Sequence, residues 1–162
     1  MAIGINAVFY NTDGDYNTAI GAFALNQNCR NVVSGCTANY NTAIGYQAGG
    51  DASFSNGNVT GSNNTYIGAG SGPGSSSALN NATAIGANAL VSASNALVLG
   101  ANGVNVGIGT STPVKPLHVA SGDVYASQAG SGLIVKSPDG NTCKRIGIDN
   151  SGAILLSDVT CP

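Results

Sequence analysis

The chain of 162 residues contains no glutamate and no tryptophan, and charged residues make up only 7% of it. Average soluble domains carry roughly 25% charged residues. Glutamate and lysine favour helices, whereas glycine and asparagine disfavour them. The lack of Glu, together with 24 glycines and many asparagines, therefore argues against long amphipathic helices.

Positive charge is also scarce. Arg30 is the only Lys or Arg before Lys115, and the net charge is −2, so the sequence has no basic cluster for a phosphate backbone. No apolar run approaches the roughly 18–20 residues of a membrane span. We identify no signal peptide, because Met1 is followed at once by residues of the repeat described below, and we expect the chain to begin inside a repeat. Hydrophobic residues make up 43% of the chain and fall in short, regularly punctuated clusters, which indicates ordered strands rather than disorder.

The four cysteines form two local pairs in the sequence, Cys29 with Cys36 and Cys143 with Cys161. Neither pair has the C-x-x-C spacing or the histidine partner of a zinc site. Each pair brackets a plausible turn, so among the three possible connectivities we predict the local one. Such bonds stabilise by about 2–3 kcal/mol each and indicate an oxidising, extracellular environment. Four free, buried thiols are the alternative.

A short phrase recurs through the first two thirds of the chain. The sequence NTAIG occupies residues 17–21 and 41–45, and close variants occupy 64–68 and 82–86. Weaker copies lie at 2–4, 96–100 and 105–109. The aliphatic residues before glycine, at positions 3, 20, 44, 67, 85, 99 and 108, are separated by 17, 24, 23, 18, 14 and 9 residues. A repeated phrase with variable spacing predicts conserved strands joined by variable loops.

Each copy has the pattern of a short strand between two turns. Side chains alternate across a strand, so Thr18 and Ile20 share one face while Ala19 points to the other. Asparagine before the strand and glycine after it favour turns. One such unit cannot bury its apolar face alone, so we predict a parallel β-roll or solenoid over residues 1–109 in which the units stack in register. The predicted repeat core is Ile3, Ile20, Ile44, Ile67, Ile85, Leu99 and Ile108, and the predicted turn glycines are Gly4, Gly21, Gly45, Gly68, Gly86, Gly100 and Gly109.

Two insertions, roughly residues 26–40 and 49–63, are predicted to project from the edges of the stack. Aromatic residues lie in or beside these loops, where their rings could bind sugars or pack between chains. The candidates for receptor contact are Tyr16, Arg30, Tyr40 and Phe54.

The NTAIG phrase, with its closest spacing of 14 residues, resembles the YadA-like head repeat of trimeric autotransporter adhesins and the similar arrays of phage tail fibres. The resemblance covers about residues 2–109. It implies a left-handed parallel β-roll, three chains side by side, and attachment to host surfaces. The spacings of 17 to 24 residues depart from the family's regular 14.

A second element, NVGIGTSTP at residues 105–113 followed by Leu117-His118-Val119, is similar to the NVGIGT-x-x-P-x-x-x-LHV element of phage tail fibres and bacterial surface proteins. That element marks a change from a repetitive shaft to the next module. Pro113 and Pro116 cannot donate ladder hydrogen bonds, so a regular strand must stop there. We therefore predict a transition at residues 110–116 and a small β module at 117–162.

In that module we predict strands at residues 117–120, 132–137, 144–149 and 153–159. Turn-forming residues at 138–141 and 149–152 predict two hairpins. The last hairpin would place Cys143 close to Cys161. This tail does not resemble the self-cleaving chaperone domain that ends many phage fibres, so we predict no autoproteolysis.

The sequence offers little for catalysis. His118 is the only histidine, and it lies in a predicted strand without an evident nucleophile or carboxylate beside it. The glycine-rich run at residues 68–74 lacks the Lys-Ser/Thr ending of a phosphate loop and is interpreted as a flexible connector. The alternation of Asn11, Asp13, Asp15 and Asn17 suggests calcium, but the glycine and carboxylate that an EF-hand needs are replaced by Tyr16 and Ala22. We predict no enzyme activity, no cofactor and no metal.

These observations favour an all-β, non-enzymatic structural or attachment segment of an extracellular trimeric fibre, in a phage tail or on a bacterial surface. Its expected partners are further copies of itself and a cell-surface glycan or protein. A subunit of an open helical filament is the alternative. A polysaccharide-degrading fibre enzyme would need paired acidic residues, whereas this chain has seven scattered Asp.

Overall fold

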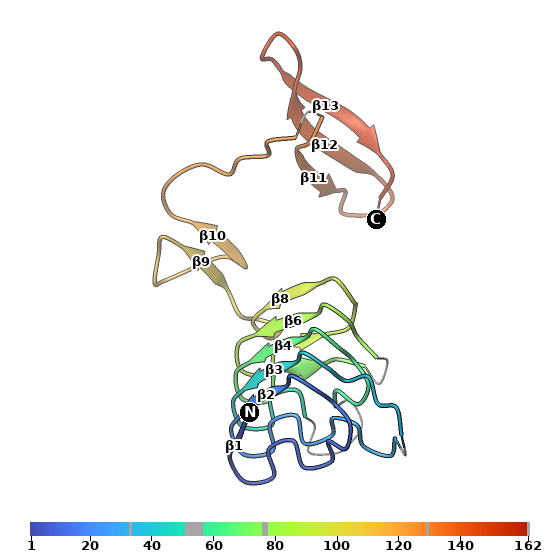
Figure 1. Cartoon of the computed structure of the whole chain (residues 1–162). Coiled ribbons are helices and arrows are strands. Elements are labelled where there is room, and N and C mark those ends of the chain that lie inside the picture. Colours follow the sequence, from blue (N-terminus) through green and yellow to red (C-terminus); the bar gives the residue numbers. More distant parts are fainter. Residues whose placement is uncertain (33, 51–56, 76–77, 129, 162) are drawn as a thin grey trace. The chain divides into compact units, whose positions relative to one another are not determined.

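The computed structural model describes residues 1–32, 34–50, 57–75, 78–128 and 130–161. The chain divides into two compact units, Met1–Ala120 and Ser121–Pro162, and both are built from β-strands (Figure 1). Among the described residues there is no helix long and apolar enough to cross a membrane. The receptor candidate Phe54 lies outside the described residues.

The first unit is a stack of coils that share one parallel sheet (Figure 1). Each coil contributes one short strand, and successive strands pair with their neighbours in the order β1-β2-β3-β4-β6-β8. The strands are β1 (Ala2–Ile3), β2 (Thr18–Ile20), β3 (Thr42–Ile44), β4 (Thr65–Ile67), β6 (Thr83–Ile85) and β8 (Leu97–Leu99).

The register of this sheet places equivalent repeat positions opposite one another. Ile20 pairs with Ile44, Ile44 with Ile67, and Ile67 with Ile85. The sheet ends at Ile3 on one side and at Leu99 on the other. The predicted in-register stack is therefore confirmed for six of the seven phrases.

The seventh phrase does not join this sheet. Strand β9 (Val106–Ile108) pairs in parallel with β10 (Leu117–Val119), so Ile108 lies opposite Val119. This pairing spans the proline-containing segment and keeps both strands within the first unit, which ends at Ala120. The division thus falls after β10, later than the boundary predicted at residues 110–116, because a parallel pair can form across the segment in which the prolines interrupt the strand.

A second wall of the coil is formed by β5 (Gly72–Pro73) and β7 (Leu90–Val91), which also pair in parallel. This wall corrects the interpretation of residues 68–74 as a flexible connector. Ser71 is fully buried, and its hydroxyl donates to the Gly68 carbonyl oxygen at 2.8 Å. The glycine-rich run is ordered because the backbone of the next coil packs directly against it.

The inside of the coil is lined by the small residue of each phrase. Ala19, Ala43 and Ala84 are fully buried, whereas Ile44 and Ile85 remain 39% and 38% exposed. The prediction that the isoleucines form the interior is therefore wrong, although their register is as predicted. The coil is too narrow for two large side chains per rung, so alternation turns the methyl group inward and the branched residue outward.

Tyr66 is an exception inside the coil, because its ring occupies the position that alanine has on the two neighbouring rungs, and it is fully buried. Gly49 makes room for it: a Cβ on Gly49 would lie 2.8 Å from Tyr66 Cδ2 and 2.7 Å from Leu25 Cδ2. A large residue on one coil is thus accommodated by a missing side chain on its neighbour.

Corners of the coil recur at fixed repeat positions with positive φ. The residue before the buried asparagine or alanine of each rung is left-handed at Tyr16, Tyr40, Asn63, Asn81 and Asn95. A second column follows the turn glycine by two residues and includes Asn6, Phe23, Gln47 and Asn88. Asparagine and glycine tolerate this conformation best, so the corners explain much of the unusual composition.

The insertion at residues 26–40 does not simply project from the edge. Residues 24–29 are buried and widen the coil, with Leu25 and Asn28 fully inside. The predicted bond between Cys29 and Cys36 is present, and Cys29 is 1% exposed. The insertion folds back because its amide side chains find partners within the stack.

The second unit is an antiparallel sheet of β11 (Leu133–Lys136), β12 (Cys143–Ile148) and β13 (Ile154–Val159). Two hairpins join them, as predicted. The Cys143–Cys161 disulfide is also present and ties the end of the chain to β12. Both disulfides are consistent with a protein that works outside a reducing cytosol.

Candidate functional site

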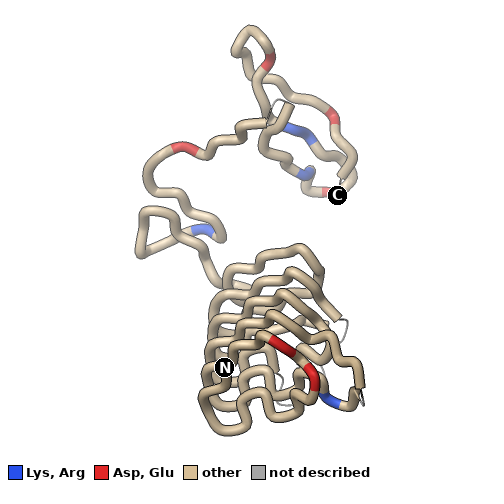
Figure 2. Tube along the Cα trace, viewed as in Figure 1, with Lys and Arg blue, Asp and Glu red and all other residues tan. Residues whose placement is uncertain are grey.

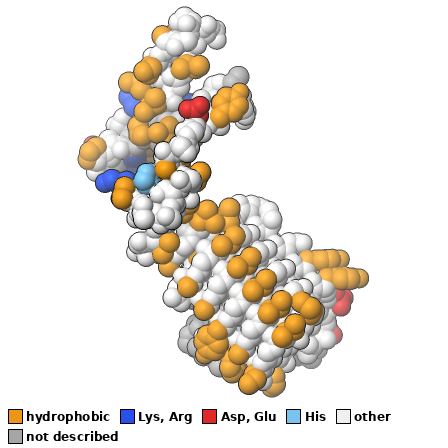
Figure 3. Space-filling view, turned by 90° about the vertical axis from the view of Figure 1, so that its left-hand side faces the viewer, with side chains coloured by type: hydrophobic (Ala, Val, Ile, Leu, Met, Phe, Trp, Pro, Cys, Tyr) orange, Lys and Arg blue, Asp and Glu red, His pale blue; other side chains and the backbone are white. Residues whose placement is uncertain are grey.

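The outer face of the six-stranded sheet carries a continuous row of aliphatic side chains, visible as hydrophobic groups on successive coils (Figure 3). Ile20 is partly buried and the other members are 36% to 56% exposed. With strands about 4.8 Å apart, six rungs form a row about 24 Å long. We call this row the aliphatic ladder: Ile3, Ile20, Ile44, Ile67, Ile85 and Leu99.

The ladder lies on a sheet without charge. None of its six strands contains Lys, Arg, Asp or Glu. The charged residues drawn on the first unit lie in the loops and turns (Figure 2). Large exposed apolar patches on soluble proteins are often interaction sites, so this surface is a candidate contact surface.

The turn glycines at the ends of the strands allow the backbones of successive coils to approach closely. A Cβ on Gly21 would lie 2.4 Å from the Gly45 carbonyl oxygen, and one on Gly45 would lie 2.7 Å from the Gly68 carbonyl carbon. All seven predicted turn glycines have positive φ. Gly4, Gly21, Gly45 and Gly68 are therefore needed both for the turn and for the contact between backbones.

A row of buried amides joins the same coils from inside, and we call Asn17, Asn41 and Asn64 the asparagine ladder. The side-chain oxygen of Asn17 accepts from the Asn41 N–H at 2.9 Å, and that of Asn41 accepts from the Asn64 N–H at 3.0 Å. Their amide nitrogens donate to carbonyl oxygens of the turn that precedes the next strand. Each asparagine thus replaces the backbone bonds that a corner cannot make.

A second set of amides fills the widened coils. Asn28 donates to the Asn11 side-chain oxygen at 2.6 Å, and Asn58 donates to that of Asn28 at 3.0 Å. The Tyr66 hydroxyl reaches Asn58 at 3.5 Å, and burial raises the pKa of this phenol far above its ordinary value. Sequence reasoning missed both amide sets, although Asn17, Asn41 and Asn64 share one repeat position.

The structure brings two receptor candidates together. Tyr16 and Tyr40 stack with ring centroids 4.8 Å apart and planes 7° apart, and both are more than half exposed. Arg30 lies elsewhere, over the ring of Tyr10 at 5.7 Å from its centroid. Phe9 packs edge-on against the same Tyr10 ring at 4.9 Å. The described receptor candidates therefore belong to two separate groups of exposed aromatic rings.

The described residues contain no group of three or more His, Cys, Asp or Glu that could hold a metal ion. Asn11 and Asn17, from the calcium-like alternation, instead contact other parts of the stack. The Nδ1 atom of His118 accepts from the Val114 N–H at 3.4 Å, so the histidine contacts its own turn.

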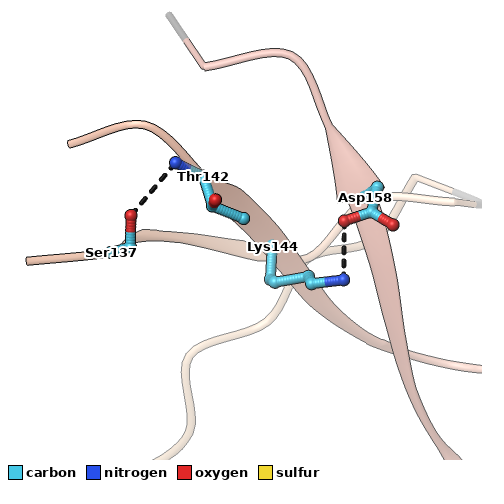
Figure 4. A network of polar contacts seen from close by, with 4 residues as sticks. All are labelled: Ser137, Thr142, Lys144 and Asp158. Atoms are coloured by element: carbon cyan, nitrogen blue, oxygen red, sulfur yellow. Dashed lines mark hydrogen bonds and ion pairs between the residues drawn. The ribbon is translucent and has the colours of Figure 1, made fainter. Parts of the chain in front are cut away.

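Two acidic residues organise the hairpins of the second unit. The Ser137 hydroxyl donates to Asp139, and that of Ser151 donates to Asp149, and these bonds hold the pKa of each carboxyl below its ordinary value. The Ser137 oxygen also accepts from the Thr142 N–H at 3.0 Å (Figure 4). Because the pKa values of both carboxyls are lowered in the folded state, the ionised groups stabilise the fold at pH values above the ordinary Asp pKa. This stabilisation is lost as the pH falls through the lowered pKa values.

One face of the second unit was not singled out from the sequence. The register of β11–β13 gathers six exposed aliphatic side chains on it. Only Ile146-Gly147-Ile148 shows the alternation of large and small residues that could have identified this face. The other two strands carry aliphatic residues at consecutive positions, Leu133-Ile134-Val135 and Ile154-Leu155-Leu156, so their pattern does not distinguish the two faces.

No family model, curated protein or solved structure matches this chain.

Proposed function

We propose that this chain is a non-enzymatic structural and attachment segment of an extracellular fibre made of three copies, in a phage tail or on a bacterial surface. The observation that carries the proposal is the aliphatic ladder on an in-register parallel stack. The stack supplies a stiff rod, and the ladder supplies a surface that a single chain leaves in water. The likeness of the NTAIG phrases to YadA-like head repeats supports three chains side by side.

The narrow interior supports an assembly for an energetic reason. Alanine and asparagine dominate the buried side chains, so one coil buries little apolar area. Each ladder residue that becomes covered would contribute about 1–2 kcal/mol, since full burial of an aliphatic side chain is worth about 1.5–3 kcal/mol. Packing three ladders together therefore adds the apolar core that each coil lacks.

Attachment would use the exposed aromatic groups. The stacked pair of Tyr16 and Tyr40, and Arg30 over Tyr10, present flat rings and one cation to a surface glycan or protein. Such rigid aromatic residues are frequent anchors in binding sites.

The association can be tested by replacing Ile44 with Lys and Ile67 with Glu in one variant. These residues are paired neighbours, so the two charges compensate each other on the single chain. We expect the wild type to have the mass of three chains in light scattering. The variant should keep its β-sheet circular dichroism but dissociate, with a dissociation constant at least about 100-fold higher.

Leu90→Glu is the matched control, because Leu90 is 53% exposed but lies on the wall formed by β5 and β7. It should remain trimeric. A wild-type mass of one chain at every concentration would overturn the proposal.

An open filament is the second candidate, because β1 and β8 are the two edges of the main sheet. An edge strand presents backbone groups to which another strand can be added. In that case the wild-type mass would rise steadily with concentration, whereas a closed trimer would hold its mass constant.

A further inference from the structure

The two faces of the sheet in the second unit differ in the number of exposed aliphatic side chains that they carry. Leu133 pairs with Ile146, and Ile146 with Leu156, so one row of three aliphatic residues crosses the sheet. Ile148 pairs with Ile154 beside this row. The face is completed on its other side by Val135, and we call these six residues the tail face: Leu133, Val135, Ile146, Ile148, Ile154 and Leu156.

The opposite face differs in character. It carries Arg145, Ser157 and the Cys143 end of the disulfide, together with two exposed aliphatic residues, Ile134 and Leu155. Arg145 donates to the Gly130 carbonyl oxygen at 2.8 Å. Cys143 is 2% exposed, so this end of the disulfide is buried within the unit itself. The covalent tie therefore stiffens the sheet from behind the tail face.

The tail face stands open. Its six side chains are between 39% and 79% exposed, although a three-stranded sheet in water needs a covered hydrophobic face to be stable. Together they expose on the order of 600 Å² of apolar surface, against about 800 Å² that each partner buries in an interface of standard size. The area suits a protein partner.

The charges beside the tail face indicate what kind of protein could cover it. At one end of the face Lys144 forms an ion pair with Asp158 at 2.6 Å (Figure 4). The register places both on the same side as the tail face, and their charges cancel. An identical face can approach without like-charge repulsion, whereas a strongly charged partner would find no counterpart.

We infer that the tail faces of the three copies pack against one another around a common axis and form the apolar core that one sheet lacks. This inference rests on the trimeric fibre proposed above. It assigns to the second unit the role of joining the chains, separately from the aliphatic ladder. Since each tail is tethered to a roll that is already in the assembly, its high effective concentration favours the contact.

The test uses the full chain with Ile148→Lys and Ile154→Glu in one variant. These residues lie directly opposite each other and are 73% and 79% exposed, so opposite charges fit the single sheet. We expect the trimer dissociation constant to rise at least tenfold and amide hydrogen exchange over residues 133–159 to accelerate at least tenfold. Leu155→Glu is the control, because Leu155 points to the other face of the same strand and should change neither quantity.

The outcomes separate this inference from the proposed function. Unchanged association and exchange in the double variant, while the Ile44 and Ile67 variant dissociates, would overturn the tail contact and leave the fibre proposal standing. A monomeric wild type at all concentrations would overturn both. Equal protection of residues 133–159 in the dissociated Ile44 and Ile67 variant would show that the chain covers its own tail face, and would overturn the contact between copies.

Discussion

Gly45→Ala is expected to destabilise the β-roll by about 3–5 kcal/mol, or to prevent its assembly altogether. Gly45 has φ of 133°, a conformation that L residues rarely adopt. Its new Cβ would also lie 2.7 Å from the carbonyl carbon of Gly68 and 2.9 Å from the Ala69 nitrogen. Backbone atoms cannot move aside as a side chain can, so two coils would have to separate. Urea unfolding followed by circular dichroism measures the loss.

Gly103→Ala separates the two contributions to that effect. Gly103 also has positive φ, 85°, but a Cβ there would meet nothing within 4 Å. The Gly103→Ala substitution should lower the free energy of unfolding by about 1–2 kcal/mol, the usual penalty for an L residue in the left-handed conformation. Equal losses at Gly45 and Gly103 would contradict the role given to the close approach of the coils.

Asn64→Ala is expected to cost about 3–5 kcal/mol, because buried groups left without a partner cost about 1–3 kcal/mol each. Asn64 is fully buried; its side-chain oxygen accepts from the Ala82 N–H at 2.9 Å, and its amide donates to the Leu79 carbonyl oxygen at 2.7 Å. Alanine would provide a hydrogen bond to neither group, and the buried ring of Tyr66, two residues along the chain, leaves little freedom for the coil to relax. The unfolding midpoint in urea should fall with little change in slope.

Asn102→Ala is the matched control, since Asn102 is an exposed asparagine outside the strands of the coil. Its effect should stay within about 0.5 kcal/mol. A loss at Asn64 as small as this would mean that water replaces the amide, and the asparagine ladder would then not hold the coils together.

The stacking of the strands could be predicted because the same residue types recur at equivalent positions of each repeat. Thr, small residue, aliphatic residue and glycine recur in the same order, and a parallel sheet places equal residues opposite each other. Which face of the sheet lies inside the coil could not be predicted in the same way. Alternation tells which residues share a face, but it does not tell which face is enclosed, and Ile44 lies outside because the coil has room only for Ala43.

Other parts needed long-range information. The interior position of Asn28 and Asn58 depends on insertions that fold back into the stack, and the spacing in sequence does not reveal such a return. The hairpins of the second unit were predictable from turn residues, because their contacts are local. The pairing of β9 with β10 was hidden by the prolines between them.

The small size of most apolar side chains inside the coil has a thermal consequence. Unfolding a typical domain raises the heat capacity by roughly 12–15 cal/mol/K per residue, mostly through hydration of newly exposed hydrocarbon. Here the enclosed side chains are mainly alanine methyls and amides, and the amides lower the increment. The dissociated chain should therefore show a heat-capacity change of unfolding, measured by calorimetry, below that range. Its free energy of unfolding should then depend only weakly on temperature.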